Sequence, residues 1–298
     1  MAQAQRSYSR EIEIKVNKST IVVESWGEGT PIVLLHGGSG PITGFGGLAP
    51  MLAEKGFRVL MINRRGFGGS KGPLDNINLH DYAEDVAGVV KNLVGSPVHI
   101  LGHAYGNRVA RCFSTDYPNL TKTVILLAAG GEVPGEEKAW AALEQLSEPN
   151  LSRSEQVKLA RASLFSPQAP SSVINRWLDA RQVSPDGQAA VLLANRTTPL
   201  EDWWEAGSSQ MLVIQGLDDR LAPPGNGRNL RNRLKGRVTL IDLEDTGHAM
   251  HVEQPEKNYR TYLAIRWQSE TVTLLSTLVG IWTVLDFIMP PALMEQSA

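Results

Sequence analysis

The chain has 298 residues and a mass of 32.5 kDa, enough to bury one full hydrophobic core plus a modest insertion. Its formal net charge is −2, its pI is about 6.3 and no run of Lys and Arg stands out, so a nucleic-acid partner is not expected. The single cysteine excludes an internal disulfide framework and fits a reducing compartment. The first residues show no apolar secretion signal, and we therefore expect a cytoplasmic protein.

The first half of the chain has the pattern of an α/β protein. Residues 11–26 alternate apolar and polar side chains around Asn17, Lys18 and Ser19, which predicts a hairpin. Short apolar runs then alternate with helical patterns, which predicts a mostly parallel central sheet with helices on both faces. Residues 78–94 form the clearest helix, because their apolar positions recur on one face. The expected strands of this part are 31–35, 58–62, 98–101 and 124–128.

The pattern changes between residues 132 and 205, where no strand-like run occurs and apolar residues have helical spacing. This segment holds four of the seven tryptophans of the chain. We take Trp140, Trp177 and Trp203 as candidates for lining an apolar substrate pocket. The alternative is that these rings only join the helical segment to the rest of the fold.

Strands are expected again at 211–214 and 238–241, and residues 268–298 form an apolar C-terminal extension. Its uncharged run is shorter than the roughly 18–20 residues that usually mark a membrane-spanning helix. The extension either packs on the core or on a partner subunit, or contacts a membrane through residues 271–289, or is an unusual C-terminus. We favour packing, and the formation of a homo-oligomer is an open alternative.

Five short motifs follow the ends of predicted strands, in an order that carries a resemblance. Residues 36–38 read H-G-G, 65–70 read R-G-F-G-G-S, 102–106 read G-H-A-Y-G, 216–219 read G-L-D-D and 247–248 read G-H. Together they resemble the α/β-hydrolase fold superfamily, in its esterase- and lipase-like form, over roughly residues 10–265. The resemblance implies a core made of residues 1–131 and 206–267 and a helical cap made of residues 132–205.

The resemblance also implies site residues. Ala104 occupies the position of the nucleophilic serine, Asp219 that of the acid and His248 that of the general base. Asp218 is the fallback acid. The backbone N–H groups of Gly38 and Tyr105 would form the oxyanion hole, with Ser39 as an alternative to Gly38. No metal and no cofactor are expected, because no cluster of His, Cys, Asp and Glu has metal-ligand spacing.

The remaining histidines and the cysteine receive other interpretations. His36 is expected to be a structural hydrogen-bonding residue, His80 to start a helix and His99 to lie in a strand. His103 is expected to point away from the substrate, and His251 to lie at the surface or behind the site. The only cysteine, Cys112, is expected to be buried and unpaired.

Ala104 leaves three functional hypotheses open. In the first, the protein is a hydrolase of a small apolar ester, lactone or related carbonyl compound, and activity is absent, weak or run by Asp219 and His248 through water. In the second, His248 is the base of a cofactor-free lyase or oxygenase. In the third, the chain binds a small molecule without turnover. The alanine is either an engineered replacement or native. We favour a native alanine, because residues 102–111 resemble bacterial α/β-hydrolase-like sequences with a G-H-A-F/Y-G elbow.

Overall fold

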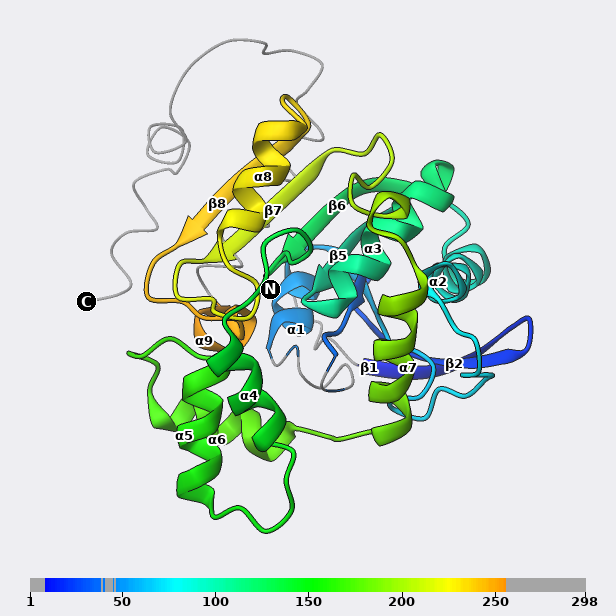
Figure 1. Cartoon of the computed structure of the whole chain (residues 1–298). Coiled ribbons are helices and arrows are strands. Elements are labelled where there is room, and N and C mark those ends of the chain that lie inside the picture. The colour runs from blue at the N-terminus through cyan, green and yellow to red at the C-terminus, as the bar shows by residue number, and fades with distance from the viewer. Residues whose placement is uncertain (1–8, 39, 41–44, 46, 256–298) are drawn as a thin grey trace, which may run out of the picture. The chain divides into compact units, whose positions relative to one another are not determined.

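The computed structural model describes residues 9–38, 40, 45 and 47–255 (Figure 1). The chain divides into two compact units, residues 1–259 and 260–298, and all described residues belong to the first. Ser39 and the predicted C-terminal extension, with its candidate membrane-contact segment, lie outside the described residues. Within the described part, no helix has the length and apolar character needed to cross a membrane.

An eight-stranded sheet forms the centre of the first unit, with the strand order β1-β2-β4-β3-β5-β6-β7-β8. The first two strands pair antiparallel as the predicted hairpin, with Asn17 and Lys18 in the turn, and the pairings from β4 to β8 are all parallel. The mostly parallel sheet predicted from the sequence is therefore confirmed. The strands are β1 (Ser9–Val16), β2 (Ser19–Trp26), β3 (Thr30–Leu35), β4 (Phe57–Ile62), β5 (Val98–His103), β6 (Thr121–Leu127), β7 (Met211–Gly216) and β8 (Val238–Leu243).

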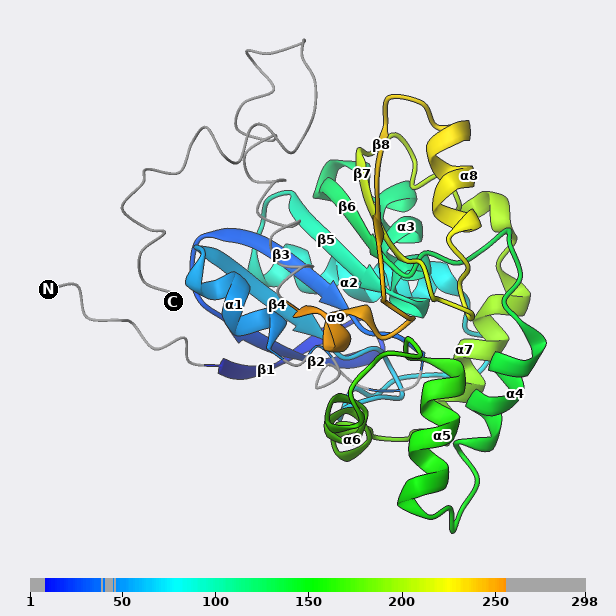
Figure 2. The ribbon, with the colours of Figure 1, turned by 90° about the vertical axis from the view of Figure 1, so that its left-hand side faces the viewer.

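Helices cover both faces of this sheet, as Figure 2 shows. Successive residues of a strand point to opposite faces, so the side chains of Val33 and Leu35 pack with α2 and α3 in the main core. The helix α1 covers the opposite face (Figure 2). The helices of the core are α1 (Leu48–Glu54), α2 (Leu79–Leu93), α3 (Tyr105–Asp116), α8 (Gly225–Arg233) and α9 (Met250–Glu253), and η2 (Pro118–Leu120) is a short 3₁₀ turn.

The predicted helix at 78–94 is observed as α2 with Asn78 as its N-cap. The Asn78 side chain accepts a hydrogen bond from the Asp81 N–H at 3.1 Å, and the Asp81 carboxylate accepts one from the Asn78 N–H at 2.9 Å. This capping box satisfies two backbone donors that the first turn of a helix leaves without partners. The helix therefore begins at Leu79, one residue after the predicted start.

Between β6 and β7 the chain is all-helical, as predicted. The first three helices of this segment form a small core of their own that includes Leu146, Phe165 and Ile174, whereas Ala190 and Ala194 of the fourth helix pack in the main core. Leu221, which follows β7, and Ala249, which follows β8, also lie in the small core. The elements are α4 (Glu137–Gln145), α5 (Arg153–Ser163), α6 (Ser171–Ala180), α7 (Pro185–Thr197) and the 3₁₀ turn η3 (Leu200–Asp202).

Candidate active site

A strained turn joins β5 to α3 at Ala104. This residue is the N-cap of α3 and has φ 51° and ψ −114°, a region that non-glycine residues rarely occupy. The turn is possible because its flanking residues are glycines. A Cβ on Gly102 would lie 2.3 Å from the carbonyl oxygen of Gly106, and a Cβ on Gly106 would lie 2.1 Å from that of Leu35. The methyl group of Ala104 is thereby presented at the wall of a cavity.

His248 lies on the same cavity wall and is held by Asp219. Its Nδ1 lies 2.9 and 3.0 Å from the two carboxylate oxygens of Asp219, whose side chain is fully buried. The carboxylate also accepts hydrogen bonds from the N–H groups of Leu221 at 3.0 Å and Ala222 at 2.8 Å. Because Nδ1 donates to the carboxylate, Nε2 is the ring nitrogen that can accept a proton. The fallback residue Asp218 does not contact this ring in the structure; its N–H donates to the Thr246 carbonyl.

His103 lies on the cavity wall. The expectation that it points away from the substrate site is therefore wrong. Its Nε2 lies 2.9 Å from the carbonyl oxygen of His248, so Nε2 carries the hydrogen of this bond. Burial, with smaller contributions from His251 and His248, holds the pKa of His103 well below its usual range, so the ring is neutral. His251, on α9, packs against His103 with ring centres 4.2 Å apart and is buried, which corrects the surface interpretation. These contacts support the loop that carries His248.

The loop after β3 is held from behind by Arg64. Its Nη2 lies 2.9 Å from the carbonyl oxygen of Gly37, and its Nη1 donates to the carbonyl of His36. The predicted structural role of His36 is confirmed by two hydrogen bonds. Its Nδ1 donates to the Gly37 carbonyl at 2.9 Å, and its Nε2 accepts from the Arg64 N–H at 3.2 Å. Burial, followed by the charge of Arg64, lowers the pKa of His36 far enough to keep it neutral.

The backbone groups of Gly38 and Tyr105 lie together at the cavity. A Cβ on Gly38 would lie 3.8 Å from the Cβ of Tyr105, and both residues line the cavity. Tyr105 is the first residue of α3, where a helix has no acceptor for its N–H. Arg64 and His36 donate hydrogen bonds to the Gly37 carbonyl, which belongs to the same peptide group as the Gly38 N–H. In a trans peptide the N–H points to the side opposite the carbonyl. The N–H groups of Gly38 and Tyr105 are therefore the candidate donors of an oxyanion hole, which stays a prediction.

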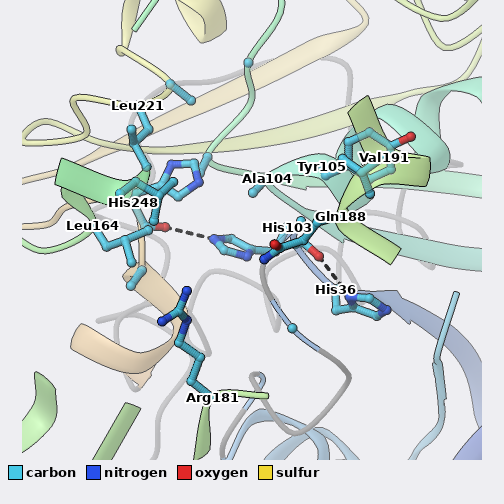
Figure 3. A pocket seen from close by; sticks show the side chains of 18 of the residues that line it. His36, His103, Ala104, Tyr105, Leu164, Arg181, Gln188, Val191, Leu221 and His248 are labelled. Carbon is cyan, nitrogen blue, oxygen red and sulfur yellow. Dashed lines mark hydrogen bonds between the residues drawn. The ribbon is translucent and has the colours of Figure 1, made fainter. Parts of the chain in front are cut away.

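The cavity has a volume of about 620 Å³, and most of its walls are apolar (Figure 3). Trp140 and Trp177, two of the three candidate tryptophans, line it. Trp203 does not line it: its ring is buried and stacks on the guanidinium of Arg111 with its centre 4.4 Å away, so its candidate role in substrate binding is corrected. Figure 3 shows Ala104 between His248 on one side and Tyr105 and Val191 on the other.

Two arginines on the cavity wall, Arg108 and Arg181, were not predicted from the sequence. Arg108 follows Ala104 by one helical turn on α3 and donates to Asn195 of α7 at 2.9 Å. Arg181 follows α6 and donates to the carbonyl of Leu146 and to the hydroxyl of Ser147, both at 2.9 Å. Within the described part of the chain, neither guanidinium takes part in an ion pair. The four-residue spacing from Ala104 could have revealed Arg108; nothing in the sequence marked Arg181.

The comparisons with known proteins bear on the family and the fold. The model of the alpha/beta hydrolase family matches residues 32–260, which is well over half of the chain. The chain belongs to the alpha/beta hydrolase family. This hydrolase-family chain is 27% identical over 254 residues to the 2-(acetamidomethylene)succinate hydrolase of Mesorhizobium japonicum, covering 82% of this chain and 90% of the relative. It is also 27% identical over 228 residues to the 2-hydroxy-6-oxononadienedioate/2-hydroxy-6-oxononatrienedioate hydrolase of Comamonas testosteroni, covering 68% and 76%.

Among solved structures, this alpha/beta hydrolase is similar to the esterase of Exiguobacterium antarcticum, with a TM-score of 0.74 and 22% sequence identity. The superposition covers 86% of this chain and 99% of the esterase. At this identity the likeness shows the fold alone, and the fold predicted from the sequence is thereby confirmed. The roles of the individual site residues remain predictions.

Proposed function

We propose that this alpha/beta hydrolase cleaves a small, mainly apolar carbonyl compound, such as an ester or a lactone, with water activated by His248 and Asp219 in place of a serine nucleophile. The observation that carries the proposal is the pairing of the His248 ring with the buried Asp219 carboxylate at a cavity wall that also presents Ala104. A chain that only binds a ligand has no need of such a pair. The relatives named above, which are hydrolases, support the same reaction class.

In the proposed mechanism a water molecule stands where a serine hydroxyl would lie, beside the Ala104 methyl. His248 Nε2 takes a proton from this water, and the remaining hydroxide bonds to the substrate carbonyl carbon. The carbonyl oxygen becomes an oxyanion that the N–H groups of Gly38 and Tyr105 stabilise. Collapse of the intermediate breaks the bond to the alcohol, which takes the proton back from His248, so one water is consumed for each bond cleaved. Asp219 orients the ring and stabilises its charged form.

The substrate also carries a carboxylate in our proposal. Arg108 and Arg181 place two guanidinium groups on the cavity wall, and the pKa of each is lowered because burial disfavours the charged form. A bound carboxylate would offset that cost with charge-assisted hydrogen bonds. The names of both relatives describe dicarboxylate substrates, which agrees with this part of the proposal.

The test compares the chain as written with Ala104→Ser, His248→Ala, Asp219→Asn and Asp218→Asn on p-nitrophenyl esters, lactones and half-esters of dicarboxylic acids. An oxyanion hole and substrate binding alone give other hydrolases about 10³–10⁴-fold acceleration over water when a triad member is missing. We expect the unmodified chain to exceed this background, and His248→Ala and Asp219→Asn should remove the acceleration above it. Asp218→Asn is the matched control and should keep it, because Asp218 does not touch His248.

Other outcomes would redirect the proposal. Turnover by Ala104→Ser alone would mean that the chain as written is a binding protein built on a hydrolase fold. Mass spectrometry in H₂¹⁸O separates hydrolysis from the other hypothesis, because only hydrolysis transfers the labelled oxygen to the product acid. A product formed without that label, or with uptake of O₂, would favour the lyase or oxygenase hypothesis.

A further inference from the structure

At the far end of α3 from Ala104, three side chains form a cluster that the proposed reaction does not use. His80 comes from the first turn of α2, and Cys112 and Asp116 come from consecutive turns of α3. Cys112 lies eight residues after Ala104, or about 12 Å along the helix at 1.5 Å per residue. The cluster is therefore separate from the cavity, and none of its members lines it.

The three ligand-type atoms of the cluster are close to one another. The Sγ of Cys112 lies 3.5 Å from the Nδ1 of His80 and 3.6 Å from an Oδ of Asp116, and the same Oδ lies 2.8 Å from Nδ1. All three atoms lie within 4.8 Å of one another. The two helices thus bring together the thiol, imidazole and carboxylate that zinc takes as ligands in proteins.

These separations match one face of a tetrahedral zinc site. With Zn–S of about 2.3 Å and Zn–N and Zn–O of about 2.0–2.1 Å, ligand atoms at tetrahedral angles lie about 3.5 Å apart for S–N and S–O and about 3.3 Å apart for N–O. The two observed distances to sulfur already agree with these values. Only the His80–Asp116 pair must open, by about 0.5 Å, when an ion replaces the hydrogen between them.

A fourth side chain supports the imidazole from its other side. The Nε2 of His80 lies 3.4 Å from an Oδ of Asp202, in the turn η3. Histidines that bind metal through one ring nitrogen usually donate the other N–H to a carboxylate, which fixes the tautomer and the ring orientation. Cys112 is fully buried, whereas His80 and Asp116 reach solvent, so an ion can approach from the solvent side.

We propose that His80, Cys112 and Asp116 form a zinc site that ties the start of α2 to the end of α3, with water as the fourth ligand. The Sγ proton and the proton between His80 Nδ1 and Asp116 leave to solvent when the thiolate and the neutral imidazole bind the ion, as metal binding to these ligands requires. Sequence spacing could not reveal this site, because His80 lies 32 residues before Cys112 and only the packing of α2 on α3 joins them. The site does not depend on the proposed reaction.

The test uses the tag-free full chain, stripped with a chelator and then titrated with Zn²⁺ by calorimetry and with Co²⁺ by absorption spectroscopy. We expect one ion per chain, a thiolate-to-cobalt charge-transfer band in the near ultraviolet and a rise in the melting temperature with zinc concentration. Asp202→Asn should weaken binding by about 10–100-fold. Cys112→Ser should remove the cobalt band, and His80→Asn, at a part-exposed position, should weaken binding if Cys112→Ser fails to fold.

Asp179→Asn, an exposed carboxylate of α6 that pairs with Arg153, is the control and should leave binding unchanged. Zinc binding that survives both Cys112→Ser and His80→Asn would overturn the proposal, because it would place the ion elsewhere, for example at the histidines of the cavity. The absence of stoichiometric zinc binding and of the cobalt band would overturn it as well.

Discussion

Arg64 and Gly37 are joined by a part-buried hydrogen bond of 2.9 Å from a guanidinium nitrogen to a backbone carbonyl, directly behind the loop that carries Gly38. The guanidinium also faces the rings of Tyr105 and Phe67, with ring centres 4.8 and 5.1 Å away, so its position is fixed on several sides. One side chain thereby sets the direction of the Gly38 N–H and packs against Tyr105, which supplies the second proposed oxyanion donor.

Arg64→Lys should therefore lower kcat by about 10–10²-fold while leaving KM nearly unchanged. The loss of one oxyanion donor costs about 10²–10³-fold elsewhere, and a misdirected donor should cost less. A lysine keeps the charge but cannot hold two carbonyls in a planar fork. The rates are best measured in the Ala104→Ser form. Arg58→Lys, whose guanidinium donates to the Leu93 carbonyl away from the site, is the control. An unchanged kcat in a folded Arg64→Lys protein would contradict the assigned position of the oxyanion hole.

Arg181→Gln should raise KM about 10–100-fold for an ester that carries a remote carboxylate and should leave KM for its neutral analogue unchanged. A hydrogen bond to a charged group contributes about 1.5–3 kcal/mol, which corresponds to this factor. Steady-state kinetics on the pair of substrates measures the difference directly. Arg153→Gln, in the same helical segment but in a surface ion pair with Asp179, should change neither value. Equal effects on both substrates would mean that Arg181 shapes the helical segment α4–α7 and does not bind the carboxylate.

His99→Gln should reduce the loss of stability that the protein suffers in mild acid. Burial, together with the charge of Lys122, lowers the pKa of His99 from 6.5 to about 4. Because the unfolded chain takes up this proton first, His99 contributes stability that is complete above pH 6.5 and is lost as the pH falls toward 4. Between pH 7.5 and 5 this contribution falls by about 2 kcal/mol, because about 1.36 kcal/mol is lost per pH unit once the unfolded chain carries the proton.

Denaturant unfolding at pH 7.5 and pH 5 measures this loss. The free energy of unfolding of the parent chain should fall more between the two values than that of His99→Gln. In the protein stripped of metal ions, His80→Gln offers a contrast of opposite sign. Burial of His80 lowers its pKa, but hydrogen bonds and charges from Asp116 and Asp202 outweigh burial and raise the pKa overall. His80 therefore contributes stability at low pH that is lost as the pH rises.

Gly106→Ala should destabilise the fold by more than about 3 kcal/mol, at the upper end of what single substitutions cost. Its Cβ would lie 2.1 Å from the carbonyl oxygen of Leu35, and strand backbone cannot move away cheaply. Gly47→Ala is the matched control, because no atom of the described residues lies within 4 Å of the added Cβ, and it should change the free energy of unfolding by less than about 0.5 kcal/mol. Urea denaturation of both variants provides the comparison.

The sequence predicted those parts of the molecule that local pattern determines. The strands of the sheet, the helix α2 and the turn at Ala104 each depend on residues within about fifteen positions of one another. The pairing of Asp219 with His248 was also expected, but through the order of motifs in a familiar fold and not through any local pattern.

The errors arose where packing between distant segments decides. Trp203 is a candidate for the pocket by its place in the helical segment, with attachment of that segment to the fold as the alternative, and its ring packs in the core against the buried guanidinium groups of Arg108 and Arg111. His103 was expected to point away, but the His248 carbonyl holds it on the cavity wall. Neither contact follows from spacing along the chain, since Trp203 and Arg111 are 92 positions apart and His103 and His248 are 145 apart.

The small core of the α4–α6 segment has a mechanical consequence for the pair of Asp219 and His248. Leu221 places its side chain in that core while its N–H donates to Asp219, and Ala249, next to His248, donates its N–H to the Leu164 carbonyl at 2.9 Å. The α4–α6 segment thus contacts the residues next to both Asp219 and His248, so a shift of these helices would act on both members of the pair. A substrate that orders these helices would align Asp219 and His248 at the same time. Substitutions in the interior of the helical segment would then change the turnover rate.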